Sequence, residues 1–471
     1  MENRKWRVIL SVIIIAGTAV GVLSCHSALS EHAPEEEQPG TQDFADRPGF
    51  SGALTFTPVA TTYLPLMSSA SGFDKWSLWT EGTLLRGANI YQRRIYPELD
   101  GADFMGPGPV GPPYTQADLT ALAALGANYV NVSHPGLFSE TAPYTLDQDS
   151  QDNLDNLLEM IAQADMFAVI TFRTGPGRSE FWAFWGEDTG ADPGNGWFDP
   201  SYYNNRVWGD RAAQDAWADM WRYTAQRYKD NPIVVGYDLM CEPNSNEVGS
   251  FPVGDPLDVW EPADFYSQYG GTLYDWNQLA PRITAAIREV DADTPILIGG
   301  MGYSAVAWLP YLQPTGDPRT VYTIHQYAPF VYTHQEPPLT NTYPGEFDTD
   351  WDGEDDNVNR AWLDDLLSTI DTFATTHNAP VAVNESGLMR WEPGAHTFMD
   401  DQMDLLEQRG INHALWLWES SWPPIQEEID AFNFRHGPDP DQHAEVESSD
   451  LLNVILEHWG HNVLRPSSAP W

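Results

Sequence analysis

An alternation of short apolar runs with helix-length amphipathic segments constrains the fold of this chain more than any other feature. Eight runs rich in Val, Ile and Ala predict buried strands, at 84–90, 127–133, 166–172, 233–240, 295–299, 320–325, 381–384 and 414–418. Helices are predicted between and after them, at 115–125, 151–164, 212–229, 276–290, 306–312, 360–376, 396–409 and 449–459. Such an order forms an all-parallel sheet, which closes naturally as a (β/α)8 barrel. The predicted fold class is therefore α/β, as a single TIM barrel over residues 50–471.

A doubly wound open sheet is the alternative, but no glycine-rich phosphate loop follows the first predicted strand. Three stretches after predicted strands are long, at 174–211, 243–275 and 328–359. In a barrel all three lie on the C-terminal face, where active sites form. Upstream, the short β-like pieces ALTFTPVA and KWSLW between residues 50 and 80 predict a hairpin that closes the bottom of the barrel.

Two of the predicted strands end in a glutamate. Glu242 follows the run IVVGYDLMC and precedes Pro243, and Glu385 follows PVAVN and precedes a small residue and glycine. Catalytic groups of barrels sit at strand ends, and a glycosidase needs two carboxyl groups, one as general acid/base and one as nucleophile. The pattern thus favours Glu242 and Glu385 as a catalytic pair. The competing interpretation is that both glutamates are buried ion-pair partners with a structural role and no catalytic one.

Charge and composition narrow the class of substrate. The formal net charge is −45, from 23 basic and 68 acidic residues, which argues against nucleic acid or another polyanion as partner. A neutral substrate suffers no such repulsion. Aromatic residues make up 13% of the chain and include 20 Trp, whose faces stack well on sugars. The acidic surface also suggests a saline habitat, as a hypothesis that salt dependence can test.

The N-terminal segment predicts export. Basic residues up to Arg7 precede an apolar stretch from Val8 to Val22, and Leu23, Ser24 and Cys25 follow. VLSC resembles a bacterial lipobox, so residues 1–24 are predicted to be a signal peptide and Cys25 to be lipidated. Residues 26–49 predict a disordered acidic tether. The expected location is the cell surface or periplasm, as a lipoprotein whose only membrane contact is its N-terminal lipid or signal anchor. Ordinary secretion and a retained anchor are the alternatives, and the oligomeric state is not predicted.

The strand order and motifs resemble those of clan A glycoside hydrolases, closest to the cellulase-type family five. The resemblance runs from RGANI, at 86–90, to LWLWES, at 415–420. It implies that Glu242, in CEP, is the acid/base and that Glu385 is the nucleophile. His325 and Tyr327 fall in the His-x-Tyr motif of the sixth strand, with Tyr327 donating a hydrogen bond to Glu385. Trp418, with Trp416 beside it, is the expected sugar-stacking residue of the eighth strand.

The chain departs from the family pattern at three strand ends. Cys241 stands where the family has an asparagine that contacts the substrate 2-hydroxyl, and a thiol is a weak donor. Asn131 stands where an arginine usually supports the nucleophile, and Arg173 where a histidine is usual. One hypothesis is an exchange, in which Arg173 supplies the missing cation while His134 supplies an imidazole nearby.

We therefore expect a retaining β-glycoside hydrolase that acts on a carbohydrate substrate without cofactor. The alternative is a non-hydrolytic carbohydrate-binding lipoprotein, in which the lost asparagine marks decayed catalysis. A metal-dependent hydrolase is disfavoured because no strand end carries a His-x-His or comparable ligand set. Asp348, Asp350 and Asp352 open a calcium-loop pattern, but Asn359 holds its twelfth position, so a solvated acidic loop is favoured. Glu419 is either a sugar contact or a solvated strand end.

Overall fold

The computed structural model of the protein describes residues 73–470, apart from 101–103, 185–201, 249–256 and 424–426. The predicted signal peptide, the tether and the piece ALTFTPVA lie outside these described residues. Within them, no helix has both the length and the hydropathy that crossing a membrane would need.

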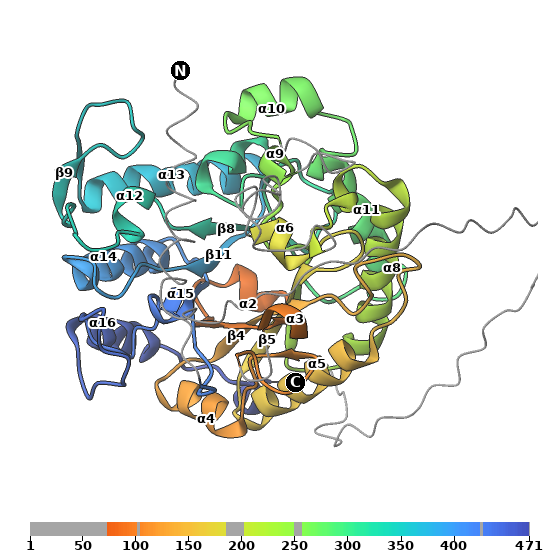
Figure 1. Cartoon of the computed structure of the whole chain (residues 1–471), viewed down its shortest axis with the longest axis horizontal. Helices are drawn as coiled ribbons and strands as arrows, with labels where there is room; N and C mark the ends of the chain where they lie inside the picture. Colours follow the sequence, from red (N-terminus) through yellow and green to blue (C-terminus); the bar gives the residue numbers. More distant parts are fainter. Residues whose placement is uncertain (1–72, 101–103, 185–201, 249–256, 424–426, 471) are drawn as a thin grey trace, which may run out of the picture.

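Eight parallel strands close into a barrel in the order β1-β12-β11-β8-β7-β6-β5-β4. Helices surround the barrel, and the helix α2 (Ser77–Thr80) lies near its centre in the view of Figure 1. The barrel strands are β1 (Arg86–Tyr91), β4 (Tyr129–Pro135), β5 (Phe167–Thr174), β6 (Val234–Asp238), β7 (Ile296–Gly299), β8 (Thr320–Gln326), β11 (Val381–Ser386) and β12 (His413–Leu415). The predicted (β/α)8 barrel is confirmed, and each predicted strand overlaps one of these strands.

The principal helices around the barrel are α4 (Gln116–Ala124), α5 (Gln148–Gln163), α8 (Arg211–Tyr228), α11 (Trp276–Arg288), α13 (Arg360–His377), α14 (Ala395–Gln408) and α16 (Asp450–Trp459). They match the predicted helices within a few residues. The segment predicted as a helix at 306–312 forms a 3-10 helix instead, η4 (Val306–Tyr311). Pro310 lies inside it, and proline has no N–H with which to continue an α-helix.

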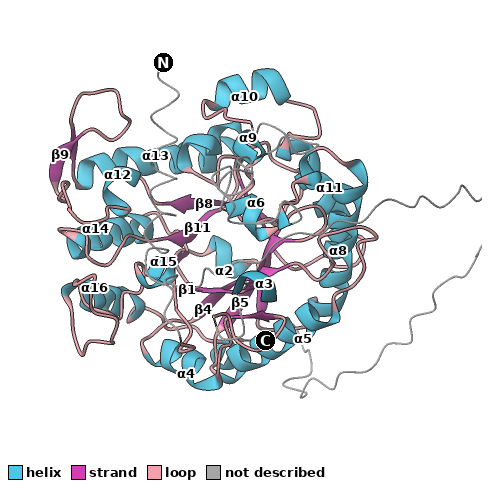
Figure 2. Ribbon diagram, in the orientation of Figure 1, coloured by secondary structure: helices cyan, strands magenta, loops and turns pink. Residues whose placement is uncertain are grey.

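The remaining elements lie mostly in the connections (Figure 2). The helices among them are α3 (Pro97–Asp100), α6 (Glu180–Phe184), η3 (Arg206–Trp208), α9 (Ser245–Val248), α10 (Pro262–Tyr269), α12 (Phe330–Thr333), α15 (Glu427–Asp430) and η5 (Pro466–Ser468). Two small sheets have two strands each: β2 (Arg93–Arg94) pairs with β3 (Val110–Gly111), and β9 (Gly345–Phe347) pairs with β10 (Asp356–Val358). Parts of the three long loops thus carry short helices and a hairpin, all after the carboxyl ends of β5, β6 and β8.

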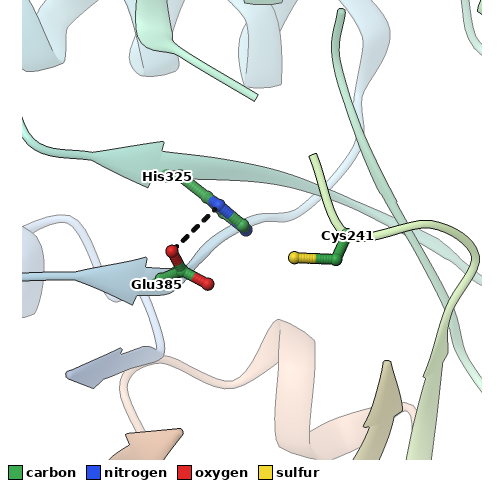
Figure 3. A group of neighbouring side chains, drawn as sticks. All are labelled: Cys241, His325 and Glu385. Carbon is green, nitrogen blue, oxygen red and sulfur yellow. Dashed lines mark ion pairs between the residues drawn. The ribbon is translucent and has the colours of Figure 1, made fainter. Parts of the chain in front are cut away.

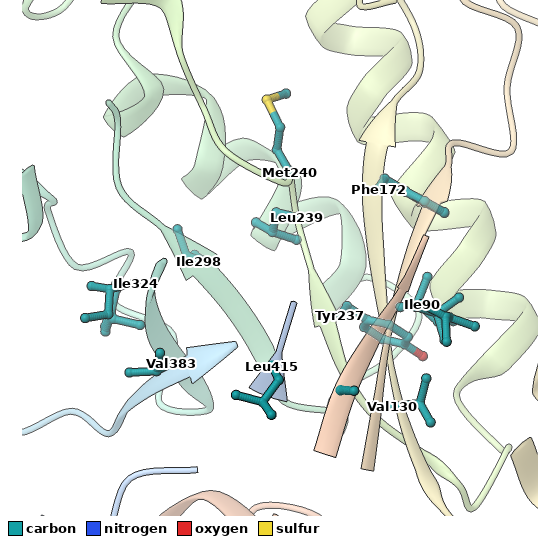
Figure 4. Packing of buried hydrophobic residues seen from close by; sticks show 14 of the residues in the cluster. Ile90, Val130, Phe172, Tyr237, Leu239, Met240, Ile298, Ile324, Val383 and Leu415 are labelled. Carbon is teal, nitrogen blue, oxygen red and sulfur yellow. The ribbon is translucent and has the colours of Figure 1, made fainter. Parts of the chain in front are cut away.

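Successive residues of one strand belong to two different hydrophobic cores. Val130 and Ile170 pack with the surrounding helices, whereas their neighbours Tyr129 and Val169 belong to a second cluster inside the barrel. Figure 4 shows the outer cluster, with Ile90, Val130, Phe172 and other side chains of the strands. Because side chains alternate across a strand, this division fixes which residues can face the barrel interior.

The barrel bottom is closed by a helix, so the predicted hairpin is wrong for its described part, KWSLW. Asp74 forms a turn just before α2 (Ser77–Thr80): its carboxylate accepts from the Trp76 N–H at 3.0 Å and its carbonyl from the Ser77 N–H at 2.9 Å. Leu78 and Trp79 are buried among the inner residues of the strands. The Trp79 indole donates to the Val235 carbonyl at 3.0 Å. The segment has the predicted position, but the turn that Asp74 forms with the next residues favours a helix over a strand.

Candidate active site

Glu242 lies just beyond the carboxyl end of β6, on backbone held by an arginine. Its φ is 52°, a left-handed value that is uncommon outside glycine. The Arg178 guanidinium donates to the Cys241 carbonyl at 2.7 Å and to the Glu242 carbonyl at 2.8 Å. Arg178 is itself buried. Strained backbone that is held by its surroundings is common at functional sites, and here it aims the Glu242 side chain.

Glu385 lies within β11, one residue before the strand ends, and is buried. The Tyr327 hydroxyl donates to Glu385 Oε1 at 2.8 Å, the contact expected from the sequence. Burial raises the pKa of Glu385 to about 6, with the Glu242 charge adding to the rise and His325 opposing it. His325, Arg173 and the Tyr327 hydrogen bond each stabilise the ionised form of Glu385 against the effect of burial.

His325, in β8, joins the two glutamates. Its Nδ1 lies 2.8 Å from Glu242 Oε1 and 3.5 Å from Glu385 Oε1. Burial disfavours the charged ring, but Glu385 and Glu242 outweigh it and raise the pKa of His325 to about 9. His325 is thus a buried cationic side chain that contacts both glutamates. Because both oxygens contact the same nitrogen, the distance between Glu242 Oε1 and Glu385 Oε1 is at most the sum of these two distances.

Cys241 is buried beside this group, at the position where the family pattern has asparagine. Its Sγ lies 3.9 Å from Arg173 Nη1. Burial, together with Glu385 and Glu242, raises the pKa of the Cys241 thiol well above its ordinary value. The side chain is therefore a neutral thiol in this setting. Figure 3 shows Cys241, His325 and Glu385 pointing toward one another from three neighbouring parts of the barrel end.

Arg173, near the end of β5, supplies a second cation to the site. It pairs with Glu180 of α6 at 2.9 Å and donates to the Ser133 hydroxyl at 3.2 Å. Its guanidinium carbon also lies 4.9 Å from the ring centroid of Tyr91 and 5.6 Å from that of Trp416. The Arg173 charge lowers the pKa of Glu385, against the effect of burial. This placement fits the first half of the exchange hypothesis.

His134 does not fit the second half of that hypothesis, which is a correction. Its Nδ1 contacts the Pro135 carbonyl at 2.5 Å and its Nε2 contacts Asn153 Oδ1, on α5, at 3.0 Å. His134 is the next residue after Ser133 in the strand, so their side chains point to opposite faces. Ser133 faces Arg173 and the site, whereas His134 faces the surrounding helices. Burial lowers the pKa of His134 to about 4, so the ring is neutral. His134 supports the packing of α5 and supplies no imidazole to the site.

Asn131 lies beneath the site in a buried polar layer. Its amide donates to Asn89 Oδ1 at 2.6 Å and to the Asn384 carbonyl at 3.3 Å, and it accepts from the Thr171 hydroxyl at 2.6 Å. Asn384 directly precedes Glu385. Asn131 thus supports the backbone of the nucleophile candidate, although it carries no charge.

Trp418 requires a second correction. The side chain is 1% exposed, within the outer hydrophobic cluster, with the Arg435 guanidinium 4.0 Å from its ring centroid. A ring so covered has no face free for a sugar. The neighbour Trp416 is only partly buried and packs edge-on against Tyr91 at 5.9 Å, beside Arg173. The strand β12 ends at Leu415, so alternation along a strand does not extend to these residues. Trp416 is the tryptophan that faces the site.

The weaker candidates lie away from the two glutamates. Asp348, Asp350 and Asp352 bring carboxylate oxygens together on the connection between β9 and β10, where they accept backbone hydrogen bonds of their own loop. Glu419 is buried and accepts from the Asn433 amide at 2.6 Å; burial raises its pKa to about 7. Glu419 is therefore not the solvated strand end that was one alternative.

Sequence reasoning missed two residues that hold the site. Arg178 clamps the backbone of Cys241 and Glu242, and Glu180 neutralises Arg173 while accepting from the Tyr91 hydroxyl at 3.2 Å. Both lie in a long loop after β5. A signal was present, because charged residues that close to a strand end, in RTGPGRSE, are unusual in a stretch otherwise rich in aromatic residues. Their partners, however, are distant in sequence.

The fold and the site together define a class. A parallel (β/α)8 barrel that presents paired glutamates and a shared histidine at its C-terminal face has the arrangement of a barrel glycoside hydrolase. The comparison with known families agrees: the description "Cellulase (glycosyl hydrolase family 5)" matches residues 98–421. The chain belongs to this family of O-glycosyl hydrolases.

Individual relatives are distant. Endoglucanase C of Acetivibrio thermocellus is 23% identical over 245 residues, which cover 50% of this chain and 59% of that protein. A beta-xylosidase of Phanerodontia chrysosporium is 22% identical over 236 residues, or 49% of this chain and 40% of the other. The chain thus spans less than two thirds of the length of these relatives. Endoglucanase Cel5A of Thermotoga maritima has the same fold, with a TM-score of 0.53 and 17% identity over 81% of this chain and all of the other.

Proposed function

We propose that this protein is a retaining β-glycoside hydrolase, in which Glu242 is the general acid/base and Glu385 is the nucleophile. The observation that carries the proposal is the single imidazole nitrogen of His325 within contact distance of both glutamates. Retaining enzymes hold their carboxyl groups about 5 to 5.5 Å apart, whereas inverting enzymes need about 6.5 to 9.5 Å to admit a water. The short contacts of one His325 nitrogen with both glutamates favour the shorter, retaining separation.

In the first step, Glu385 attacks the anomeric carbon while Glu242 protonates the departing glycosidic oxygen. Tyr327 orients the attacking carboxylate through its 2.8 Å hydrogen bond. In the second step, Glu242 takes a proton from water, which attacks the glycosyl-enzyme and releases Glu385. His325 Nδ1 is hydrogen-bonded to Glu242 and lies 3.5 Å from Glu385, so its positive charge stabilises negative charge on either side chain.

The substrate that this site favours is a neutral β-linked glucan or mannan chain. A strongly negative protein disfavours polyanionic glycans, and Trp416 offers a ring beside the catalytic pair. Matching structures include Thermotoga maritima Cel5A in complex with cellobiose, at a TM-score of 0.52, and with mannotriose, also at 0.52. We further propose that the protein is exported and anchored by lipidated Cys25, which would place it where such chains occur.

The test is a screen of purified protein against β-glucans, β-mannans and aryl β-glycosides, with Glu385→Gln as the matched control. Hydrolysis by the wild type and at least ~10³-fold less by the variant is the expected result. If the wild type binds one of these glycans and hydrolyses none, the hydrolase proposal fails. The chain is then a carbohydrate-binding protein. Cys241→Asn, which restores the residue of the family pattern, is then the first substitution to test for recovered hydrolysis.

A further inference from the structure

Three side chains at the barrel end offer the ligand atoms of a metal site. The Cys241 sulfur, a His325 ring nitrogen and a Glu385 carboxylate oxygen all lie within 4.8 Å of one another. Each comes from a different strand or strand end, and Figure 3 shows the three groups converging. All three residues are buried, and the Glu242 side chain beside them is 15% exposed.

This donor set suits zinc better than the hard cations. Thiolate, imidazole and carboxylate are the ordinary zinc ligands, with bonds of about 2.0 to 2.3 Å in a tetrahedral array. Such bonds separate neighbouring ligand atoms by roughly 3.5 Å. His325 Nδ1 and Glu385 Oε1 already have that separation, at 3.5 Å. Calcium and magnesium prefer oxygen ligands and gain little from the sulfur of Cys241.

The surrounding charges are mixed, and on balance they favour a cation. Glu242 contacts the same histidine nitrogen, and buried Asp238 lies near enough to influence His325 electrostatically. The opposing cation is Arg173, 3.9 Å from the sulfur, and its charge is already balanced by Glu180. Binding requires that the Cys241 thiol and the coordinating His325 nitrogen each lose a proton to solvent, and the charge of the zinc ion favours both losses.

We propose that Cys241, His325 and Glu385 form a Zn²⁺ site, with a water molecule or Glu242 in the fourth position. Zinc bound there occupies the carboxylate of Glu385 and draws His325 away from its contact with Glu242. The ion therefore inhibits hydrolysis reversibly and competes with the substrate. The inhibition, though not the binding, rests on the proposed function.

The experiment uses the full chain with Cys25→Ser, which leaves Cys241 as the sole thiol. Co²⁺ is the first probe, because a thiolate bound to cobalt gives an intense near-ultraviolet charge-transfer band. One equivalent of Co²⁺ should produce the band, and Zn²⁺ should abolish it by displacement. A second substitution in this protein, Cys241→Ser, should remove the band. It should also weaken Zn²⁺ binding by about tenfold or more, since one of three ligands is lost. Asp348→Asn, in the acidic loop, should leave the band unchanged.

A band that persists in the Cys241→Ser protein, or an unsubstituted site that binds neither ion, overturns the inference. So does equal zinc affinity of the two proteins. Hydrolysis is measured separately, in the presence of a chelator, so the two proposals fail independently. A protein that hydrolyses glycosides with the chelator and binds no zinc refutes only the metal site. A protein that binds zinc through Cys241 and hydrolyses nothing refutes only the proposed function.

Discussion

Arg173 connects the aromatic residues of the site to the proposed catalytic pair. Its guanidinium lies over Tyr91 and Trp416, pairs with Glu180 and lowers the pKa of the Glu385 carboxyl. A charge in this position helps the proposed nucleophile to remain ionised, and its stacking fixes the rings of Tyr91 and Trp416.

We expect Arg173→Ala to lower kcat/KM by about 10- to 100-fold, or roughly 1.4 to 2.7 kcal/mol of transition-state stabilisation. It should also cost ~3 to 5 kcal/mol of folding stability, because the Glu180 carboxylate, 2% exposed, is left buried without its cation. The double variant Arg173→Met with Glu180→Gln removes both charges, so it should regain most of the stability and none of the rate. Kinetics with urea unfolding of both variants measure this, and an unchanged rate in Arg173→Ala would contradict the assigned role.

His134 makes the folded protein sensitive to acid. Its pKa is lowered by burial to about 4 in the folded state, against about 6.5 when unfolded. Between these values the unfolded chain binds a proton that the folded protein does not, so stability falls as the pH drops from 6.5 to 4. The loss approaches ~3 kcal/mol at the lower end. His134→Gln should abolish this part of the pH dependence in urea unfolding at pH 7 and pH 4.5. An unaltered difference between the two pH values would be evidence against it.

The positions of Glu242, Glu385 and Tyr327 were predictable because each follows or ends an apolar run, and strand ends meet at one face of a barrel. His134 was misplaced although its sequence position held the answer, since it has the opposite parity to Asn131 and Ser133 along the same strand. Trp418 could not be placed in this way, because β12 ends before it. Arg178 and Glu180 escaped prediction because their partners are fixed only by the folded loop.

At the scale of elements, the barrel strands were the most predictable part of the chain. Parallel strands are covered on both faces, so each one appears as a continuous apolar run that needs no partner to be recognised. The segment at 75–79 was misassigned because aromatic residues favour strands in general, whereas Asp74 starts a helical turn through its own hydrogen bonds. The local turn at Asp74 outweighed residue propensity there.

The helix α2 should contribute substantially to stability through Trp79. Trp79→Ala is expected to cost ~3 to 5 kcal/mol, because the ring is buried inside the barrel and packs edge-on against Tyr129 at 6.4 Å. Trp79→Phe keeps an aromatic ring but leaves the Val235 carbonyl without its donor, so it should cost less, ~1 to 3 kcal/mol. Urea unfolding measures both. Rates of hydrolysis should hardly change, since α2 lies at the end of the barrel opposite the glutamates. Two variants as stable as the wild type would refute this account of the closure.

The whole molecule carries a formal charge of −45, which raises its self-repulsion in dilute buffer. We expect the melting temperature to rise with KCl, most steeply at low concentration, where the Debye length shortens from about 10 Å at 0.1 M toward 3 Å at 1 M. A neutral osmolyte at matched osmolality should not reproduce that early rise. If melting temperature and rate are both indifferent to molar KCl, the hypothesis of adaptation to a saline habitat is wrong.

The measurement that tests the central claim most directly is the product formed when azide replaces water on an activated aryl β-glycoside. In Glu242→Ala, azide needs no general base and attacks the glycosyl-enzyme, so the account predicts a β-glycosyl azide. In Glu385→Ala, azide enters the vacated position of the nucleophile and yields the α-glycosyl azide. Those two products would assign both glutamates in one experiment. The same anomer from both variants, or a wild-type product of inverted configuration, would contradict the two-glutamate retaining mechanism.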